Sequence, residues 1–134
     1  MSTAAFLARA AGNFAVVGAS TNRTKFGNKC LRCYLQHQLP VVGVNPGAAG
    51  ADIEGVPSFV SLDEIEEIHA VTVVTPPQAA LATVEQLIAK KVQHVWFQPG
   101  AESPEAVDKA REAGLNVISG GPCLLVELGF SSEF

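Results

Sequence analysis

The first 51 residues of this 134-residue chain contain no aspartate and no glutamate. They carry five basic residues, whereas the rest of the chain carries four basic residues and all 13 acidic ones. The formal net charge of −4 therefore belongs to a chain whose two parts have opposite signs. A small positive region on an acidic protein suits a compact anionic ligand, whereas nucleic acid usually requires a broad basic face. We expect a small-molecule nucleotide ligand and no nucleic-acid partner.

Cysteine is also scarce. Cys30, Cys33 and Cys123 are an odd number and too few for a disulfide framework, which favours a reducing compartment. The Cys30–Cys33 spacing would suit a redox or zinc site, but no second cysteine pair or nearby histidine completes a metal site. Phe26, Cys30 and Tyr34 share one helical stripe, which favours packing against a core.

Long apolar runs are absent, and none reaches the ~18 residues of a membrane span. We therefore expect no membrane partner. The length predicts one domain, residues 1–134, with a core over 14–128. Residues 1–13 predict an N-terminal helix or arm. A mitochondrial presequence is the alternative, but the short length and single arginine favour an ordinary helix and a cytoplasmic protein.

Five short, almost wholly apolar runs predict strands that are covered on both faces. They are residues 14–18, 41–44, 70–74, 95–97 and 116–118. Segments 26–38 and 77–90 between them have helical length. The alternation of strand and helix predicts an α/β fold, a three-layer sandwich with a mostly parallel five-stranded sheet.

Signals for helix ends support this alternation. Ser61 and Glu64 have the spacing of a capping box, which predicts a short helix at this point. Ser103 and Pro104 predict the start of another helix, with the serine as the N-cap residue and the proline at the first helical position. Gly114 stands where a helix needs a left-handed C-terminal residue.

Parallel sheets bind ligands at the carboxyl ends of their strands. After the first strand, Gly18, Ala19 and Ser20 form a small-residue turn that leads into a helix, whose free amides and dipole favour phosphate. Arg23 and Lys25 follow and could add charge-assisted contacts. This turn predicts a phosphate site, and a glycine turn with solvated basic residues is the alternative.

The dinucleotide fingerprint G-x-G-x-x-G is missing, because Ser20 and Arg23 occupy its later glycine positions. The second strand ends at Asn45-Pro46. This place has neither the acidic residue that binds the ribose hydroxyls in NAD-binding folds nor an arginine of the kind that binds NADP. Both nicotinamide cofactors are therefore disfavoured against another nucleotide.

Catalytic groups are hard to find. His69 and His94 precede strands and so belong at the amino ends, away from the predicted cleft, and His37 ends a helix. Ser20 has no evident base. Cys123 is the one nucleophile at a strand exit, without an evident partner. We expect a binding protein without catalytic residues.

Taken together, the strand exits resemble the stand-alone CoA-binding domain family, a Rossmann-like group that is also similar to the CoA-binding N-terminal domain of the succinyl-CoA synthetase α subunit. The matching stretches, in order, are AVVGAST, VVGVNP, IEGVPSFVSLDEI, VTVVTPP, HVWFQPGAESPEAVDKAREAGLNVI and GPCLLVE. They cover the chain from about residue 14 to residue 127.

The resemblance implies coenzyme A or an acyl-CoA as the ligand. It implies CoA phosphates at the turn 18–20, with Lys25 as a basic contact. The other implied contacts follow the second, third and fourth predicted strands: Val44, Asn45 and Pro46; Thr75, Pro76 and Pro77; and Gln98, Pro99 and Gly100.

The chain departs from the family pattern in two places. Many members carry an aromatic-basic pair where this chain has Thr75-Pro76, and the family's Cys-Pro appears here as Pro122-Cys123. The synthetase phosphohistidine belongs to a second domain that has no counterpart in these residues, so acyl-CoA synthesis by this chain alone is not expected.

Two alternatives to a non-catalytic binding module remain open. One is an accessory subunit of an acyl-CoA synthetase or transferase, which would need a partner chain. The other is an NAD(P)- or CoA-responsive redox regulator, in which Cys123 or Cys30 forms a mixed disulfide with the CoA thiol. A homodimer and a partner enzyme subunit are both compatible with the sequence.

Overall fold

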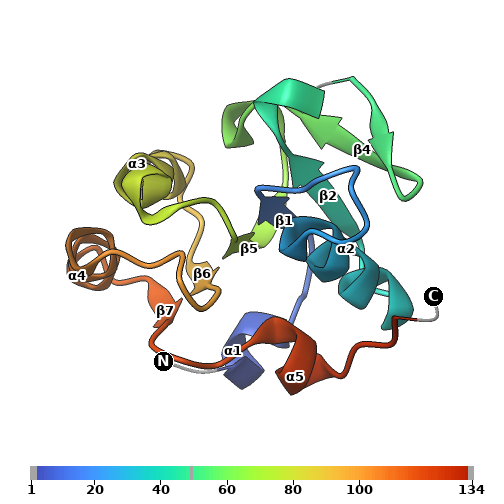
Figure 1. Cartoon of the computed structure of the whole chain (residues 1–134). Helices are drawn as coiled ribbons and strands as arrows, with labels where there is room; N and C mark the ends of the chain where they lie inside the picture. Colours follow the sequence, from blue (N-terminus) through green and yellow to red (C-terminus); the bar gives the residue numbers. More distant parts are fainter. Residues whose placement is uncertain (1–2, 49, 133–134) are drawn as a thin grey trace.

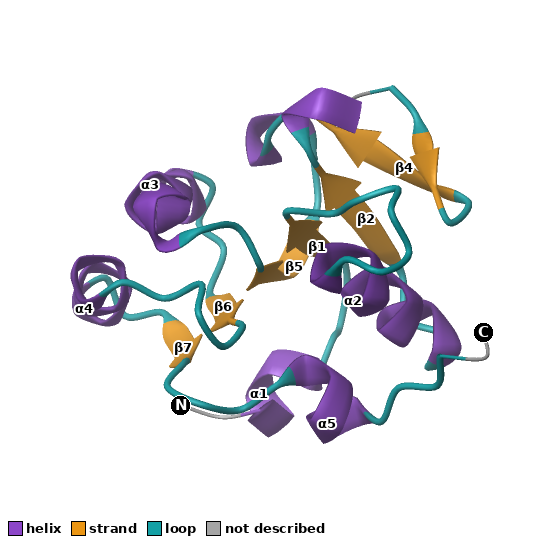
Figure 2. Cartoon of the chain, in the orientation of Figure 1, coloured by secondary structure: helices purple, strands orange, loops and turns teal. Residues whose placement is uncertain are grey.

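The protein folds into one twisted sheet with helices on both faces (Figure 1, Figure 2). The computed structural model describes residues 3–48 and 50–132. The strands are β1 (Asn13–Val17), β2 (Val41–Val44), β3 (Asp52–Ile53), β4 (Val56–Phe59), β5 (Ile68–Val73), β6 (His94–Phe97) and β7 (Asn116–Ile118). The helices are α1 (Thr3–Leu7), α2 (Phe26–Gln36), α3 (Ala80–Ala89), α4 (Pro104–Glu112) and α5 (Leu124–Leu128), with short 3₁₀ turns η1 (Pro46–Ala48), η2 (Leu62–Glu64) and η3 (Pro77–Ala79).

The strand order is β3-β4-β2-β1-β5-β6-β7, so the described residues form seven strands and the prediction of five is wrong. The five predicted strands are all present, and they are parallel to one another in the order β2-β1-β5-β6-β7. The additional strands are β4, which is parallel to β2, and β3, which pairs with β4 in the antiparallel direction.

The two additional strands are a hairpin inserted after β2. Its two turn residues, Glu54 and Gly55, both have positive φ, at 53° and 84°, as a type I′ turn requires. The strands are short, and Pro57 interrupts the second. A proline and a polar surface weaken the strand signal, so apolar runs alone did not reveal this hairpin.

Side chains of each central strand alternate between two cores, one on each face of the sheet. From β1, Phe14 and Val16 pack on the side of α1, α2 and α5, whereas Ala15 and Val17 pack on the side of α3 and α4. The helices of these two layers lie on opposite sides of the sheet in Figure 1. Burial on both faces explains why these strands are apolar throughout.

The predicted helix ends are largely present. Ser103 Oγ accepts a hydrogen bond from the Ala106 amide at 3.2 Å, and Gly114 has φ 85°. The predicted capping box is present, and the Glu64 carboxylate accepts a hydrogen bond from the Ser61 amide at 3.4 Å. The element that follows this capping box is the 3₁₀ turn η2 and not an α-helix. Among the described residues, no helix has the length and apolar character needed to cross a membrane.

The amino ends of β5 and β6 hold two histidines, as the topology predicts. His69 Nε2 is 2.7 Å from the Phe6 carbonyl oxygen of α1 and so ties this short helix to the sheet. The rings of His69 and His94 lie 5.0 Å apart. Burial, and then the charge of His69, lower the pKa of His94. Both histidines therefore pack against the N-terminal helix rather than line the carboxyl ends of the strands.

A buried hydrogen bond between the hydroxyls of Tyr34 and Thr72 joins α2 to β5. We expect Tyr34→Phe to lower the free energy of unfolding by about 1–3 kcal/mol, because it leaves the Thr72 hydroxyl buried without a partner. Equilibrium unfolding in urea measures this change. The double variant Tyr34→Phe/Thr72→Val removes both polar groups. Its loss in the free energy of unfolding should therefore be clearly smaller than the sum of the losses in the two single variants. Additive losses would show that the two hydroxyls do not interact.

Candidate functional site

A hollow of about 350 Å³ lies at the carboxyl ends of β1, β2 and β5. Five predicted ligand residues line it: Gly18, Val44, Asn45, Pro46 and Thr75. The other lining residues are Val17, Val60, Ser61, Ala79, Thr83 and Gln86. The structure thus brings together residues from three strand exits that are far apart in the sequence.

A second hollow, of about 150 Å³, lies at the carboxyl ends of β5 and β6. The three predicted residues Gln98, Pro99 and Gly100 line it, together with Phe26, Val74 and Ala101. Val74 lines this smaller hollow and its neighbour Thr75 lines the larger one. The two hollows therefore flank the end of β5.

The remaining predicted residues line neither hollow. Ala19 is buried in the turn after β1, Ser20 is half-buried, and Arg23 and Lys25 are exposed. Pro76 and Pro77 are exposed where the chain enters η3.

The turn after β1 depends on three glycines. Gly18 has φ 99°, a conformation that L side chains rarely adopt. A Cβ atom on Gly27, in the first turn of α2, would lie 1.9 Å from the Gly18 carbonyl oxygen. A Cβ atom on Gly43 of β2 would lie 2.9 Å from the Ala19 Cβ. Gly27 and Gly43 were not identified from the sequence as residues that shape the turn. The available signal was the position of Gly27 just inside the predicted helix 26–38.

Side-chain amides hold the carbonyl groups of this turn. Asn45 Nδ2 donates to the Ala19 carbonyl at 2.6 Å, and Asn28 Nδ2 donates to the Ser20 carbonyl at 2.9 Å. The amides of Gly18 and Ala19 both donate to the Val44 carbonyl. These two amides are therefore already engaged. The first amides of α2 are a candidate anion site, because the N-cap residue Lys25 makes no side-chain capping bond.

An acidic residue reaches the basic turn from the inserted hairpin. Glu54 Oε2 lies 3.2 Å from Arg23 Nε and accepts from Asn28 Nδ2 at 3.1 Å. The turn that looked free of acid in the sequence therefore has a carboxylate beside it. Because the Arg23 side chain is 54% exposed, this ion pair contributes little to stability, about 0–1 kcal/mol. The ion pair matters for binding, because the Glu54 carboxylate would compete with an anionic ligand for the Arg23 guanidinium.

Three buried polar atoms in the described residues have no hydrogen-bond partner: Thr75 Oγ1, Gln98 Nε2 and Glu102 Oε2. All three belong to residues that follow β5 or β6. Gln98 Oε1 accepts from the Leu124 amide at 2.9 Å, and because an amide N–H can only donate, this bond fixes which end of Gln98 is free. Unpaired buried polar atoms are costly, and Thr75 and Gln98 also line the two hollows, which makes these strand exits a candidate ligand site.

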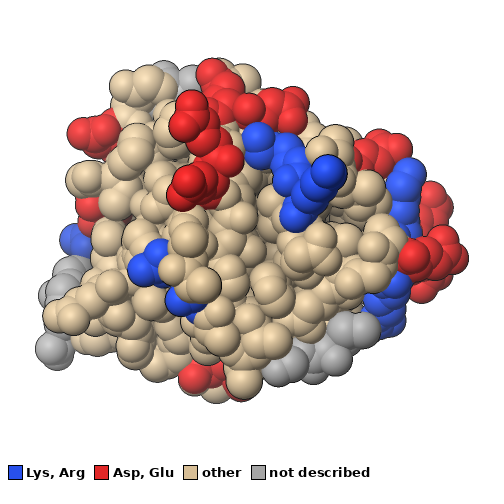
Figure 3. All heavy atoms as spheres, turned by 180° about the vertical axis from the view of Figure 1, so that it is seen from behind, with Lys and Arg blue, Asp and Glu red and all other residues tan. Residues whose placement is uncertain are grey.

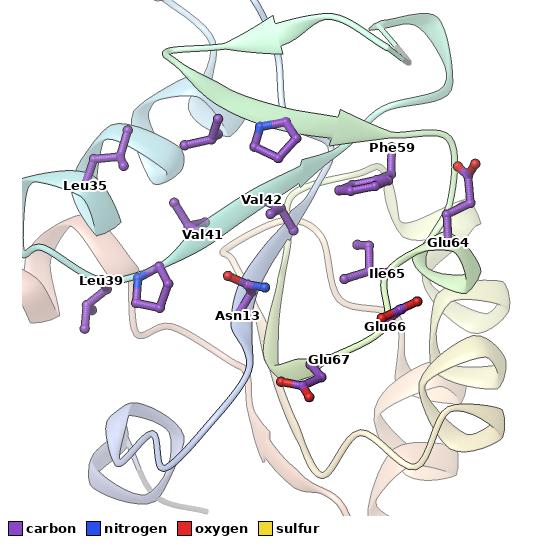
Figure 4. Close-up of a pocket in the computed structure, with 13 residues that line it drawn as sticks. Asn13, Leu35, Leu39, Val41, Val42, Phe59, Glu64, Ile65, Glu66 and Glu67 are labelled. Atoms are coloured by element: carbon purple, nitrogen blue, oxygen red, sulfur yellow. The ribbon is translucent and has the colours of Figure 1, made fainter.

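A larger hollow, of about 730 Å³, lies elsewhere, beside β2 and the segment that leads into β5 (Figure 4). Its floor includes Val41, Val42 and Phe59, and Glu64, Glu66 and Glu67 line it as well. Figure 3 shows acidic side chains on the back of the molecule, with basic side chains among them. The three carboxylates that line this hollow of about 730 Å³ repel an anionic ligand, so it does not suit a phosphate compound.

The cysteines differ in accessibility. Cys30 and Cys33 are buried, whereas Cys123 is half-buried and precedes α5. Burial raises the pKa of Cys30 well above its ordinary value and that of Cys33 to about 11. Phe26, which the helical stripe placed in the core with Cys30, is instead 38% exposed. The described residues contain no group of three or more side chains suited to a metal ion.

Comparison with known proteins shows the family to which the chain belongs. The CoA-binding domain family matches residues 12–129, and the chain belongs to this family. A conserved hypothetical protein from Pyrococcus furiosus is 34% identical, with a TM-score of 0.78 over 87% of this chain and 99% of that one. A hypothetical protein from Pyrococcus horikoshii OT3 is 32% identical, with a TM-score of 0.80 over 87% of this chain and 80% of that one.

A more distant structure shares the fold alone. UDP-N-acetylglucosamine 3-dehydrogenase from Acidithiobacillus ferrooxidans is 23% identical, with a TM-score of 0.55 over 79% of this chain and 37% of that one. The fold is thus an α/β Rossmann-like one with a mostly parallel sheet, as predicted apart from the number of strands.

Gly27→Ala tests the close contact beneath the turn. Alanine favours a helix over glycine by about 1 kcal/mol, but the clash is with a backbone carbonyl that no side-chain rotation relieves. We expect a net loss of about 1–3 kcal/mol in the free energy of unfolding, measured in urea. Gly47→Ala is the control, because its Cβ would meet its nearest atom at an ordinary 3.4 Å. Stabilisation by Gly27→Ala would contradict the contact.

Thiol labelling with a maleimide at neutral pH tests the cysteine environments. We expect Cys123 to react first and Cys30 and Cys33 to react only after unfolding, because burial excludes the reagent and disfavours the thiolate. The variant Cys123→Ser should show no fast phase. A fast phase in this variant would mean that a buried thiol is accessible.

Proposed function

We propose that this protein binds coenzyme A or an acyl-CoA at the carboxyl ends of its strands and has no catalytic activity of its own. The observation that carries the proposal is the pair of hollows on either side of the end of β5, next to the glycine turn, with unpaired polar atoms of Thr75 and Gln98 among the lining residues. Membership of the CoA-binding domain family supports it.

The order of groups in CoA matches the order of features in the site. The pyrophosphate of CoA lies between the adenosine 3′-phosphate and the pantetheine arm. In the protein, the turn 18–20 and the amino end of α2 follow β1, and the sheet order continues to β2 on one side and to β5 and β6 on the other. We place the phosphates near Ser20 and Lys25, with the nucleotide in the hollow of about 350 Å³ near Val44, Asn45 and Pro46.

The charges suit a ligand with several phosphates. Lys25 is exposed at the N-cap of α2, where the helix dipole also favours an anion. Arg23 is shared with Glu54 in this structure. A phosphate group that binds Arg23 would compete with the Glu54 carboxylate for the same guanidinium. Glu54 is therefore expected to weaken the binding of an anion at this turn.

The positions of the histidines and of Cys30 in the described part of the chain are compatible with a binding role. His69 and His94 contact the N-terminal helix and each other at the opposite ends of the strands. Cys30 is buried, and burial raises its pKa, which disfavours the reactive thiolate. Contacts to CoA would come instead from backbone groups, amide side chains and Lys25.

Isothermal titration with CoA, dephospho-CoA and NAD tests the proposal. We expect CoA to bind most tightly, because it carries a phosphate that the other two lack. Lys25→Ala should weaken CoA binding by about 1.5–3 kcal/mol, the range for hydrogen bonds to charged groups. Glu54→Gln should strengthen it, because the variant removes the carboxylate that competes with a phosphate group for the Arg23 guanidinium.

The matched control is Lys90→Ala, because Lys90 follows α3 on the side where the strands begin and contacts the Asp63 carbonyl. Its CoA affinity should equal that of the unchanged protein. Absence of CoA binding below millimolar concentration would overturn the proposed function. Equal losses in Lys25→Ala and Lys90→Ala would show that the phosphates lie elsewhere.

A further inference from the structure

The smaller hollow lies on the side of the turn away from the nucleotide. If the nucleotide occupies the hollow at the ends of β1 and β2, the pantetheine arm leaves the phosphates on the opposite side, toward β5 and β6. β1 and β6 are separated by one strand, so their axes are about 10 Å apart. A flexible arm that crosses this distance ends at Gln98, Pro99 and Gly100, which line the smaller hollow.

The walls of the smaller hollow are mostly apolar. Phe26, Val74, Pro99 and Ala101 contribute side chains without polar atoms. Phe26 is one of three large hydrophobic side chains that are exposed among the described residues. Mostly hydrophobic and aromatic walls with one polar group are typical of small-molecule sites.

Gln98 supplies the one polar side chain of this lining. It is 1% exposed, and its Oε1 is held by the Leu124 amide while Nε2 has no acceptor. A thioester carbonyl oxygen would accept this hydrogen bond. The free CoA thiol would not satisfy it well, because sulfur is a weak acceptor. A group with a carbonyl and an apolar chain therefore fits this lining better than a thiol does.

The volume limits the length of that chain. The hollow has a volume of about 150 Å³, less than half of the about 350 Å³ of the hollow at the ends of β1, β2 and β5. A short acyl chain such as a butyryl group therefore suits it better than a long one. A long fatty chain would have to leave the hollow past Phe26.

We propose that the smaller hollow is an acyl site, so that the protein prefers short-chain acyl-CoA thioesters to free CoA, with Gln98 donating to the thioester carbonyl and Phe26 limiting the chain length. This inference rests on the proposed function, because the phosphates must anchor the ligand. It goes beyond that function in assigning the class of acyl group and the residues that select it.

Competition titrations with CoA, acetyl-CoA, butyryl-CoA and decanoyl-CoA on the full chain provide the test. We expect acetyl-CoA to bind about tenfold more tightly than CoA, because it satisfies the buried donor. Butyryl-CoA should bind more tightly again, because each buried methylene adds favourable transfer free energy. Decanoyl-CoA should gain nothing over butyryl-CoA.

Gln98→Glu tests the role of the Nε2 donor while keeping the hydrogen bond that holds this side chain in place. The variant keeps an oxygen for the Leu124 amide and removes the Nε2 donor. We expect the ratio of acetyl-CoA affinity to CoA affinity to fall from about ten to about one at mildly alkaline pH, where the new carboxylate cannot donate a hydrogen bond. Gln98→Met, which carries no amide donor, should lose the same preference, and urea unfolding shows whether each variant is folded.

Phe26→Ala tests the length limit, with Val126→Ala as the control because Val126 is an exposed apolar residue outside the hollow. Phe26→Ala should raise the affinity for decanoyl-CoA relative to butyryl-CoA, and the control should not. Equal binding of CoA and all thioesters would overturn the acyl site and leave the proposed function intact. Failure of every CoA compound to bind would overturn the proposed function itself.

Discussion

The contact between the Gly18 carbonyl and the first turn of α2 constrains the rest of the site. Only a residue without Cβ at position 27 allows this approach, because a methyl group would lie 1.9 Å from the carbonyl oxygen. The contact sets how close α2 lies to β1. It thereby places the amino end of the helix, with its uncapped amides, next to the strand exits.

The same constraint organises the packing on that face of the sheet. Once α2 lies close to β1, Tyr34 reaches the Thr72 hydroxyl of β5, and Phe14 stacks on Tyr34 with ring centroids 4.8 Å apart. On the far side of β5, Trp96 Nε1 donates to the Pro122 carbonyl and Gln98 holds the Leu124 amide. These two bonds attach the segment before α5 to β6 and orient the free amide end of Gln98.

Electrostatics at the turn come from both the local sequence and the inserted hairpin. Arg23 and Lys25 follow the turn directly, whereas Glu54 arrives from a segment 31 residues after Arg23 in the numbering. Its left-handed backbone at φ 53° belongs to a tight hairpin that positions the carboxylate over Arg23 and Asn28. The charge that a ligand meets at this turn is therefore smaller than the acid-free sequence of the first 51 residues indicates.

Local patterns by themselves determined the five parallel strands, the helices between them, the caps at Ser103 and Gly114, and the edge of the sheet where most of the predicted ligand residues meet. These features depend on apolar runs and on the conformational preferences of neighbouring residues, which a sequence displays directly. Only the tertiary structure decided which residues meet: Gly27 with Gly18, Glu54 with Arg23, Leu124 with Gln98, and Phe26 at the rim of the smaller hollow. Such contacts join segments that are distant in the chain, and their distances follow from how the helices and the hairpin pack on the sheet. No pattern of neighbouring residues records that packing.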